Sequence, residues 1–231
     1  MTVADPTLEA ERELFASGAR YVIGCDEVGR GAIAGPVAVG LCAVDARLVE
    51  ANRMPEGLRD SKMLSEPRRE AIAPLASAWA LHSAVGLASA DEVDRLGIIA
   101  CLGLAGKRAL SELHAAGLAI LESTILLDGH HDWLSPALTS PLAVRTRIKA
   151  DRDCGSVAAA SVIAKVHRDR LMIAADAELP GYEWSGNKGY GSAGHLAAID
   201  RLGPSRLHRL SWLRTPAMLH SAAAALVGET A

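Results

Sequence analysis

Residues 21–31 read Tyr-Val-Ile-Gly-Cys-Asp-Glu-Val-Gly-Arg-Gly. The apolar beginning predicts a strand over residues 21–25, and the glycines at the end predict a functional loop. Between them stand two adjacent carboxylates, Asp26 and Glu27, which repel each other and are poor strand formers. A divalent cation needs clustered oxygen ligands and offsets this repulsion. The segment therefore predicts a metal-binding strand end, with a simple solvent-exposed strand end as the alternative interpretation.

A second apolar run, residues 121–127, ends on Asp128 and then turns at Gly129. Asp-Gly is also an ordinary turn dipeptide, so this run alone does not decide between a turn and a ligand. Its place in the sheet favours a ligand. If this strand is a parallel neighbour of the first one, Asp26 and Asp128 emerge side by side at one edge of the sheet.

A third acid follows the apolar run at residues 142–148, where Lys149, Ala150 and Asp151 precede a long Ala-rich segment. Asp153 is an alternative to Asp151, because either acid could cap the helix that begins there. Carboxylates gathered from three strand ends can hold two Mg²⁺ or Mn²⁺ ions about 3.5–4 Å apart, which activate a water and stabilise the leaving oxygen of a phosphodiester. This pattern predicts a metal-dependent enzyme that hydrolyses a phosphate polymer.

The remaining segments predict an α/β fold. Further strands are expected at residues 36–44 and 80–88, and helices at residues 66–79, 98–115 and 156–179. The order strand-strand-strand-helix-strand-helix-strand-helix predicts a mixed sheet that begins antiparallel and whose later strands run parallel to the first. Pro74 should kink or split the helix at residues 66–79, and an Ala-rich helix is expected at residues 216–226.

Length and composition agree with one main domain. The chain has 231 residues, of which 50% are hydrophobic, enough for one core of about 150–200 residues and a small appendage. The longest apolar runs, such as residues 32–44, are broken by Gly and Pro and are too short to span a bilayer. The acidic start of the chain lacks the features of a secretory signal, so a cytoplasmic protein is expected.

The charge of the chain is unevenly distributed. Its formal net charge is −3, which argues mildly against a strong nonspecific nucleic-acid binder. Residues 145–214, however, hold twelve Lys and Arg against seven Asp and Glu. A basic C-terminal half beside an acidic cluster is typical of a metal-dependent enzyme that acts on nucleic acid, although an ordinary solvated surface explains the charge equally well.

Other residue patterns support alternatives less well. His130 and His131 follow Asp128 and suggest a zinc hydrolase, but the spacing of zinc hydrolases is missing and hard carboxylates favour Mg²⁺ or Mn²⁺. One of these histidines could instead move a proton or contact a phosphate. The four cysteines lack metal-finger spacing and are expected to pack in the core, with a reactive thiol at Cys154 as the alternative.

Several motifs together resemble the ribonuclease HII family, in the order in which that family has them. The first is Asp26-Glu27-Val28-Gly29-Arg30-Gly31, and single acids match at Asp128 and Asp151. The other matching segments are Asp60-Ser61-Lys62 with Leu64-Ser65, the Ala-rich stretch at residues 158–169, Lys188-Gly189-Tyr190-Gly191, and His208-Arg209-Leu210-Ser211-Trp212. The likeness covers residues 21–216, and several ordered motifs are far more specific than any one alone.

The resemblance implies a ribonuclease H-like mixed five-stranded sheet flanked by helices, with a small C-terminal helical extension. It implies an endonuclease that uses Mg²⁺ or Mn²⁺ to cut the RNA strand of RNA–DNA hybrids, and single ribonucleotides in duplex DNA, leaving 3′-OH and 5′-phosphate ends. It selects Asp151 over Asp153 and implies as metal ligands and catalytic residues Asp26, Glu27, Asp128 and Asp151. The implied substrate-binding residues are Gly29, Arg30, Gly31, Asp60, Ser61, Lys62, Lys188 and Tyr190.

The same comparison suggests three parts of the chain: an N-terminal extension at residues 1–20, a catalytic domain at residues 21–179, and a C-terminal helical, substrate-binding part at residues 180–231. A monomer is expected, because no heptad run or long apolar helix face is present. The main alternative is a metal-dependent DNA nuclease or resolvase of the same fold. Such an enzyme would share the acids without needing the Gly-Arg-Gly turn and Tyr190.

Overall fold

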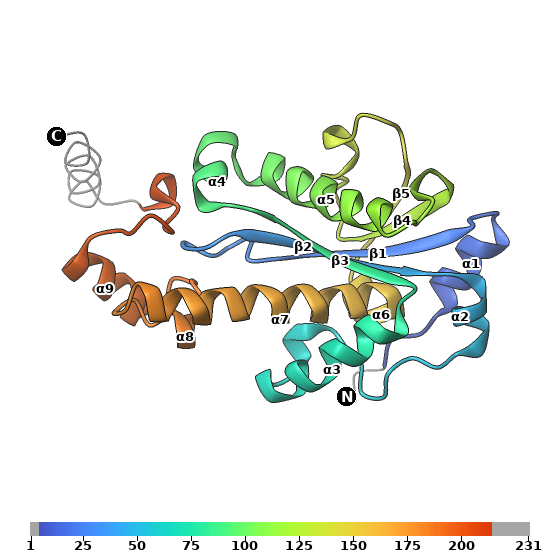
Figure 1. Ribbon diagram of the computed structural model, residues 1–231, viewed down its shortest axis with the longest axis horizontal. Helices are drawn as coiled ribbons and strands as arrows, with labels where there is room; N and C mark the ends of the chain where they lie inside the picture. Colours follow the sequence, from blue (N-terminus) through green and yellow to red (C-terminus); the bar gives the residue numbers. More distant parts are fainter. Residues whose placement is uncertain (1–4, 214–231) are drawn as a thin grey trace.

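The computed structural model describes residues 5–213, which form one five-stranded mixed sheet between layers of helices (Figure 1). The strand order is β3-β2-β1-β4-β5. β1 pairs antiparallel with β2 and parallel with β4, which confirms the predicted mixed sheet. The strands are β1 (Tyr21–Val28), β2 (Val37–Val44), β3 (His82–Ala88), β4 (Ser123–Asp128) and β5 (Ala143–Arg147).

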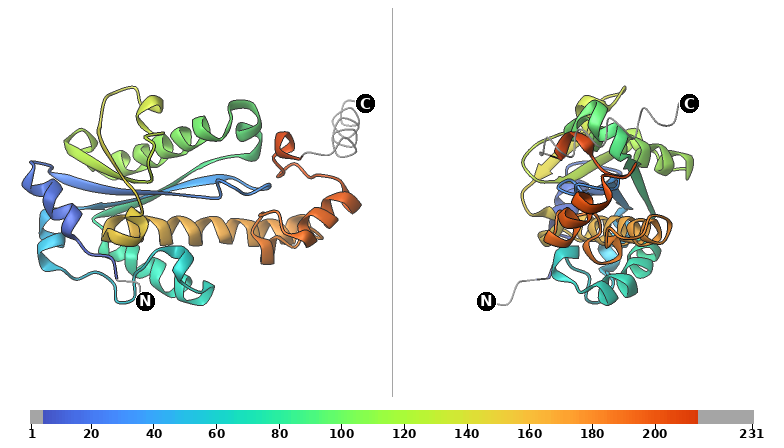
Figure 2. Two further views of the ribbon diagram at one scale, coloured as in Figure 1. Left: turned by 180° about the vertical axis from the view of Figure 1, so that it is seen from behind. Right: turned by 90° about the vertical axis from the view of Figure 1, so that its left-hand side faces the viewer.

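Helices cover both faces of this sheet. α5 (Ile98–Ala115) packs across β2 and β3 on one face, and α7 (Gly155–Glu178) crosses β1 and β2 on the other, with α3 (Glu66–Trp79) packed against α7 (Figures 1 and 2). The shorter helices are α1 (Glu9–Ala16), α2 (Ala46–Ala51), α4 (Ala90–Leu96), α6 (Ala150–Asp153), α8 (Trp184–Asn187) and α9 (Ala193–Leu202). Single 3₁₀ turns are η1 (Ser61–Met63), η2 (Ile120–Glu122), η3 (Ser135–Ala137) and η4 (Leu210–Trp212).

Small residues explain how closely α7 lies on the sheet. A Cβ atom on Gly24 would be 2.3 Å from the backbone of Ser156, and one on Gly40 would be 2.4 Å from the carbonyl oxygen of Ala160. Both contacts are far too short for real side chains, so these strand positions have to be glycine. The helix surface that faces them is itself built of alanine and serine, and it therefore approaches β1 near the end that carries Asp26.

Three apolar clusters form the core. Alternate residues of β1 divide between the two faces of the sheet, so that Val22 packs toward α7 and Ile23 packs toward α5. A third cluster, which includes Met172, Tyr182 and Trp184, joins the far end of α7 to the chain after residue 180. In Figure 2 this C-terminal part extends α7 beyond the end of the sheet.

The structure corrects parts of the predicted element order. No helix longer than the single turn η3 lies between β4 and β5 in the described chain, because residues 129–142 contain Gly129, Pro136 and Pro141. α2 and α3 lie between β2 and β3, so the first three strands are not consecutive elements. Pro74 lies inside α3 without splitting it. The helix expected at residues 216–226 lies outside the described residues.

Other expectations about the core and surface can be compared directly. All four cysteines are buried, as a packing role requires, and burial raises the pKa of the Cys154 thiol to about 12.

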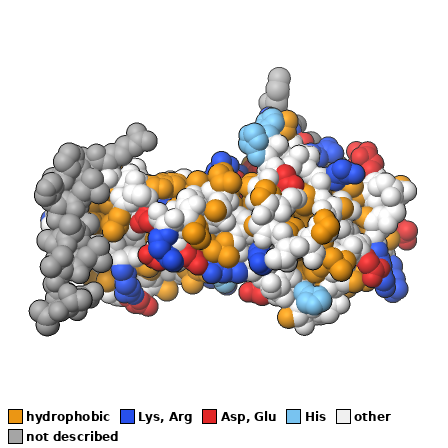
Figure 3. All heavy atoms as spheres, turned by 90° about the horizontal axis from the view of Figure 1, so that it is seen from above, with side chains coloured by type: hydrophobic (Ala, Val, Ile, Leu, Met, Phe, Trp, Pro, Cys, Tyr) orange, Lys and Arg blue, Asp and Glu red, His pale blue; other side chains and the backbone are white. Residues whose placement is uncertain are grey.

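None of the helices in residues 5–213 has the length and apolar character needed to cross a bilayer. The side of the molecule that carries α5 mixes apolar, acidic and basic side chains, and neither sign of charge dominates there (Figure 3).

Candidate metal centre and substrate pocket

Three carboxylates meet beside the end of β4. Asp128 ends that strand, whereas Asp26 lies inside β1, which continues to Val28 because residues 26–28 still pair with β2, so the strand does not end at residue 25 as expected. The parallel register pairs Cys25 with Leu127, so the next residues on each strand, Asp26 and Asp128, are neighbours. Asp151 joins them from α6, because the Asp128 carboxylate accepts hydrogen bonds from the backbone N–H groups of Ala150 at 2.7 Å and Asp151 at 3.4 Å. One carboxylate oxygen from each of the three acids lies within 4.8 Å of the others. We call Asp26, Asp128 and Asp151 the acidic cluster.

Burial makes the acidic cluster electrostatically costly without a cation. Asp26 is 2% exposed, and its Oδ2 atom has no hydrogen-bond partner among residues 5–213. Burial, reinforced by the charge of Glu27, raises the pKa of Asp26 well above its usual range, and burial together with Asp151 raises the pKa of Asp128. A buried carboxylate oxygen without a partner, beside two further carboxylates, fits a hard divalent cation such as Mg²⁺ or Mn²⁺.

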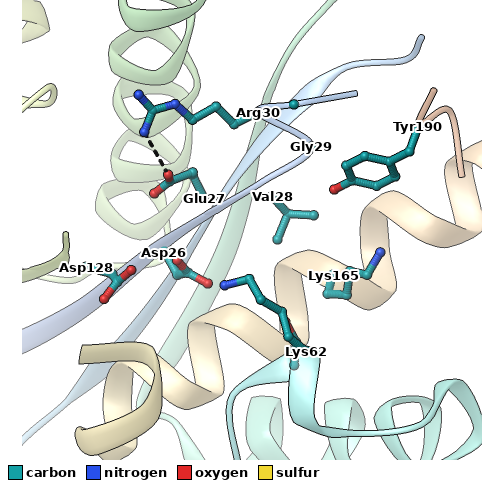
Figure 4. Close-up of a pocket in the computed structure, with 11 residues that line it drawn as sticks. Asp26, Glu27, Val28, Gly29, Arg30, Lys62, Asp128, Lys165 and Tyr190 are labelled. Atoms are coloured by element: carbon teal, nitrogen blue, oxygen red, sulfur yellow. Dashed lines mark hydrogen bonds and ion pairs between the residues drawn. The ribbon is translucent and has the colours of Figure 1, made fainter. Parts of the chain in front are cut away.

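Glu27 lies apart from the acidic cluster. Side chains alternate along a strand, and Glu27 points to the opposite side of β1 from Asp26, where its Oε1 atom is 3.4 Å from Nη1 of Arg30 (Figure 4). Burial raises its pKa, while Arg30 opposes that shift. Glu27 nevertheless lines the same pocket as Asp26 and Asp128.

Lys62 brings a positive charge to the acidic cluster. It lies in η1, where the Asp60 carboxylate caps the turn by accepting the Lys62 N–H at 3.0 Å, and the Ser61 hydroxyl bonds that of Ser161 on α7 at 2.8 Å. The Lys62 ammonium is 3.0 Å from Oδ2 of Asp151. Burial alone would lower the pKa of Lys62, but Asp26 and Asp151 outweigh it and raise the pKa.

A pocket of about 240 Å³ opens beside these groups (Figure 4). Residues 29–31, which we call the 29–31 turn, form one wall, and Tyr190 and Lys165 form the opposite wall. Tyr190 is 37% exposed, which leaves its ring accessible, and the Lys165 ammonium lies 5.6 Å from the ring centroid. The complete lining is Asp26, Glu27, Val28, Gly29, Arg30, Gly31, Ser61, Lys62, Asp128, Lys165 and Tyr190.

Comparison with known proteins agrees with this geometry. The family model described as Ribonuclease HII matches residues 23–215. The chain belongs to the ribonuclease HII family. It is 47% identical to the Ribonuclease HII of Streptomyces griseus over 216 residues, which cover 92% of this chain and 86% of that protein. Family membership makes the chain a ribonuclease H hydrolase.

Two solved structures share the fold of this ribonuclease HII family member. The ribonuclease H2 of Pyrococcus horikoshii OT3 matches with a TM-score of 0.62 at 24% identity, covering 87% of this chain and 98% of that one. Bst-RNase HIII in complex with Mn²⁺ matches with a TM-score of 0.66 at 24% identity, covering 90% and 71%. These similarities confirm the ribonuclease H-like mixed sheet with helices on both faces.

Two of the predicted substrate-binding residues, Asp60 and Lys188, do not line the pocket. Asp60 is buried and caps the turn that carries Lys62. Lys188 lies in another environment. It is 7% exposed, and its ammonium bonds the carbonyl oxygen of Ser185 and lies 3.3 Å from Oε2 of Glu66. It is absent from the pocket lining, whereas Lys165 is present there. Lys165 lies in the Ala-rich stretch that resembles the family, but that stretch did not single it out as a substrate-binding residue, because a lysine on such a helix is ordinarily solvated.

The histidine alternative finds no support in the described residues. His130 and His131 are exposed and do not line the pocket. The group of possible metal ligands found within residues 5–213 consists of carboxylates only. A different histidine, His195, is fully buried and donates from Nδ1 to the carbonyl oxygen of Tyr190 at 2.8 Å, so it helps to place Tyr190. Sequence analysis did not select it, although it lies only five residues after Tyr190, across the N-terminus of α9.

Proposed function

We propose that the protein is an endonuclease that hydrolyses the RNA strand of RNA–DNA hybrids and cuts at single ribonucleotides embedded in duplex DNA. It uses two Mg²⁺ or Mn²⁺ ions and leaves 3′-OH and 5′-phosphate ends. The observation that carries this proposal is the acidic cluster, with its unpartnered Asp26 oxygen, at the floor of a pocket lined by the 29–31 turn and Tyr190. The proposed ligands are Asp26, Glu27, Asp128 and Asp151.

When bound, the metal ions would supply an activated water and charge stabilisation for the leaving oxygen. The protein contributes the placement of the ligands. Asp128 is held by two backbone N–H groups of α6, which also orients the neighbouring Asp151. Lys62 at 3.0 Å from Asp151 reduces the repulsion among the acids and offers an ammonium to a phosphate at the pocket mouth. Asp60 and Ser61 fix the turn that presents Lys62.

The opposite walls of the pocket are proposed to recognise the sugar. Glycine at positions 29 and 31 lets the backbone approach a ribose closely, and the 2′-OH is the group that distinguishes RNA from DNA. The exposed ring of Tyr190 can stack against a sugar or base at the junction of RNA and DNA. Arg30 and Lys165 are proposed to contact phosphates that flank the cleavage site. Lys188 remains a prediction from the sequence and is not part of this arrangement.

The first experiment measures cleavage of a labelled DNA duplex that carries one ribonucleotide, with Mg²⁺ or Mn²⁺. The intact protein should cut on the 5′ side of the ribonucleotide, and Asp128→Asn should be nearly inactive. Asp91→Asn is the matched control, because Asp91 is an exposed acid on α4 that pairs with Arg95. Equal or faster cleavage of an all-DNA duplex by the intact protein would instead support a DNA nuclease or resolvase of the same fold.

We also propose that the protein acts in the cytoplasm as a monomer. The sequence supports the monomer, because it has no heptad run or long apolar helix face for self-association. Light scattering on the purified protein should give the mass of one chain, with and without a ribonucleotide-containing duplex. A dimer at working concentrations would contradict the proposal.

A further inference from the structure

Two arginines lie fully buried behind the pocket without a carboxylate partner. Arg168 on α7 and Arg209 near the end of the described chain are both 0% exposed. Within residues 5–213, neither guanidinium takes part in an ion pair, in contrast to exposed arginines such as Arg170 and Arg206, which pair with glutamates. We call Arg168 and Arg209 the arginine pair.

Arg209 binds two carbonyl oxygens of the 29–31 turn and a third in the segment that follows it. Its Nη2 donates to the carbonyl of Gly29 at 2.8 Å, and Nη1 donates to that of Arg30 at 3.0 Å. Its Nε and Nη2 atoms also reach the carbonyl of Gly35 at 3.3 and 3.2 Å. A planar guanidinium with several fixed donors can hold three carbonyl groups at once, and an ammonium cannot reproduce that geometry.

Arg168 connects the segment after the turn to the segment that carries Tyr190. It donates to the carbonyls of Ala34 at 3.0 Å and Pro36 at 2.8 Å, and also to that of Lys188 at 2.8 Å. Its guanidinium carbon lies 5.4 Å from the centroid of the Tyr190 ring. One buried side chain therefore bonds both the segment that follows the 29–31 turn and the segment that leads into Tyr190.

The backbone supports the same connection. The N–H groups of Ile33 and Ala34 donate to the carbonyl of Gly189 at 2.9 and 3.0 Å, directly beside Tyr190. Gly29 has a positive φ of 81°, and a Cβ atom there would lie 2.1 Å from Nε of Arg168. The turn is thus packed tightly against Arg168 as well as bonded to Arg209.

Burying two unpaired guanidinium groups lowers the stability of the folded protein. Removing a charged group from water costs several kcal/mol in a folded protein, and a buried charge is ordinarily paired with an opposite charge. Burial, reinforced by the charge of Arg168, lowers the pKa of Arg209 to about 10, which shows that the site disfavours the cation. Apolar residues of similar size would fill the same space without this penalty. They could not hold six different carbonyl groups in a fixed arrangement.

We propose that Arg168 and Arg209 are positioning residues which fix the distance between the 29–31 turn and Tyr190, and thereby set the preference for a ribonucleotide over a deoxyribonucleotide. The inference rests on the proposed function, because it assigns sugar recognition to those two walls. It predicts that the arginine pair acts on substrate discrimination and not on the acidic cluster, which is held separately by the pairing of β1 with β4 and by α6.

The test compares Arg209→Lys and Arg168→Lys with the intact protein, since lysine keeps the positive charge but loses the guanidinium geometry. Matched controls are Arg206→Lys and Arg170→Lys, because both arginines are exposed and lie near the pair in sequence. Three quantities are measured: Mn²⁺ affinity and stoichiometry by calorimetry, kcat/KM on a duplex with one ribonucleotide, and the ratio of Ki for an all-DNA competitor duplex to KM. The Mn²⁺ stoichiometry gives the fraction of each variant that is folded and able to bind metal.

The expected result is a fall in kcat/KM of about 100-fold for each buried variant, the size that a displacement of about 1 Å produces. The ratio of Ki to KM should fall about 10-fold toward one, because discrimination between ribose and deoxyribose requires both walls of the pocket. The Mn²⁺ affinity should stay within about twofold of that of the intact protein. The controls should behave like the intact protein in all three measurements.

Two results would overturn the inference. An unchanged ratio of Ki to KM in folded variants would show that the arginine pair does not affect discrimination. Loss of stoichiometric Mn²⁺ binding in both lysine variants would show that the pair serves folding of the whole domain. Failure of the proposed function is a separate outcome: the intact protein itself would then give equal values of Ki and KM.

Discussion

The two halves of the pocket are held in place by different kinds of interaction. The acidic cluster comes from neighbouring positions on two adjacent strands and the first turn after β5, so backbone pairing of β1 with β4 already brings Asp26 and Asp128 together. The 29–31 turn and Tyr190 come from distant segments, and buried side chains from α7 and the C-terminal part hold them. One half thus depends on sheet topology, and the other depends on particular long-range hydrogen bonds.

The acidic cluster and the arginine pair also differ in how their charges are compensated. The acidic cluster contains like charges at close range, which burial makes unfavourable until a cation binds. The arginine pair also contains two like charges, but oriented carbonyl dipoles surround each of them. The comparison teaches that the acidic cluster is electrostatically unfavourable by itself, whereas each guanidinium of the arginine pair already has hydrogen-bond partners. Substitutions should therefore separate metal binding from placement of the turn.

The largest effect should come from removing a carboxylate of the acidic cluster. Asp151→Asn is expected to lower kcat/KM about 1000-fold, since the bound cation contributes several kcal/mol of transition-state stabilisation. Asp153→Asn is the control, because Asp153 is the neighbouring acid that pairs with Arg152 at 2.7 Å, and it should stay within about twofold. Cleavage rates and Mn²⁺ titrations of the two variants measure the difference. A larger loss in the Asp153 variant would mean that the ligand has been misassigned.

A smaller effect, on stability, should distinguish two glycines of the turn. Gly29→Ala places a methyl group 2.1 Å from Arg168 at a φ of 81°, at an expected cost of about 2 kcal/mol. This corresponds to a fall in Tm of about 4–8 °C for a chain of this size. Gly31→Ala meets no atom within 4 Å and should leave Tm unchanged. Thermal unfolding of both variants is the measurement, and equal Tm values would show that the turn is not packed as described.

The acidic cluster should also make stability depend on pH when no metal is present. Asp26 has a raised pKa in the folded state, so above the ordinary carboxyl pKa the folded protein binds more protons than the unfolded one. Stability must then fall as pH rises through that window, by up to about 1.4 kcal/mol per pH unit. Tm measured against pH should show this fall in the intact protein relative to Asp26→Asn. Saturating Mn²⁺ should remove this fall of Tm with pH from the intact protein. A Tm of the intact protein that rises with pH relative to Asp26→Asn, without metal, would contradict the assigned burial.

The smallest expected effect concerns a single phosphate contact. Lys62→Gln should weaken binding of all duplexes similarly and reduce the slope of log affinity against log salt by about one, as the loss of one phosphate contact does. Lys107→Gln is the control, because Lys107 is exposed on α5, away from the pocket. Affinities at several salt concentrations give both slopes. An unchanged slope for the Lys62 variant would limit its role to its ion pair with Asp151.

The positions of the acids could be predicted from the sequence better than those of the proposed substrate-binding residues. Asp128 ends β4 and Asp151 follows β5, but Asp26 lies inside β1, two residues before its end at Val28, and not beyond the strand as expected. One assumption about parallel pairing was still enough to bring Asp26 and Asp128 together. Lys188 and Lys165 show the opposite case. Both are lysines in motifs shared with the ribonuclease HII family, yet only Lys165 lines the pocket. Lys188 has a φ of 52°. The sequence around it does not predict this backbone conformation, which sets the direction of its side chain.

The amino-acid sequence by itself determined the acids that end or follow the apolar runs, the mixed order of the sheet, and, through the alternation of side chains along a strand, the opposite directions of Asp26 and Glu27. These features follow from residue type and spacing, which act over a few neighbouring positions. Only the tertiary structure decided that Gly24 and Gly40 have to be glycine beneath α7, that Lys188 is buried, and that Arg209 bonds the 29–31 turn. The physical reason is that hydrogen bonds between distant segments depend on how helices pack on the sheet, and no local pattern encodes that distance.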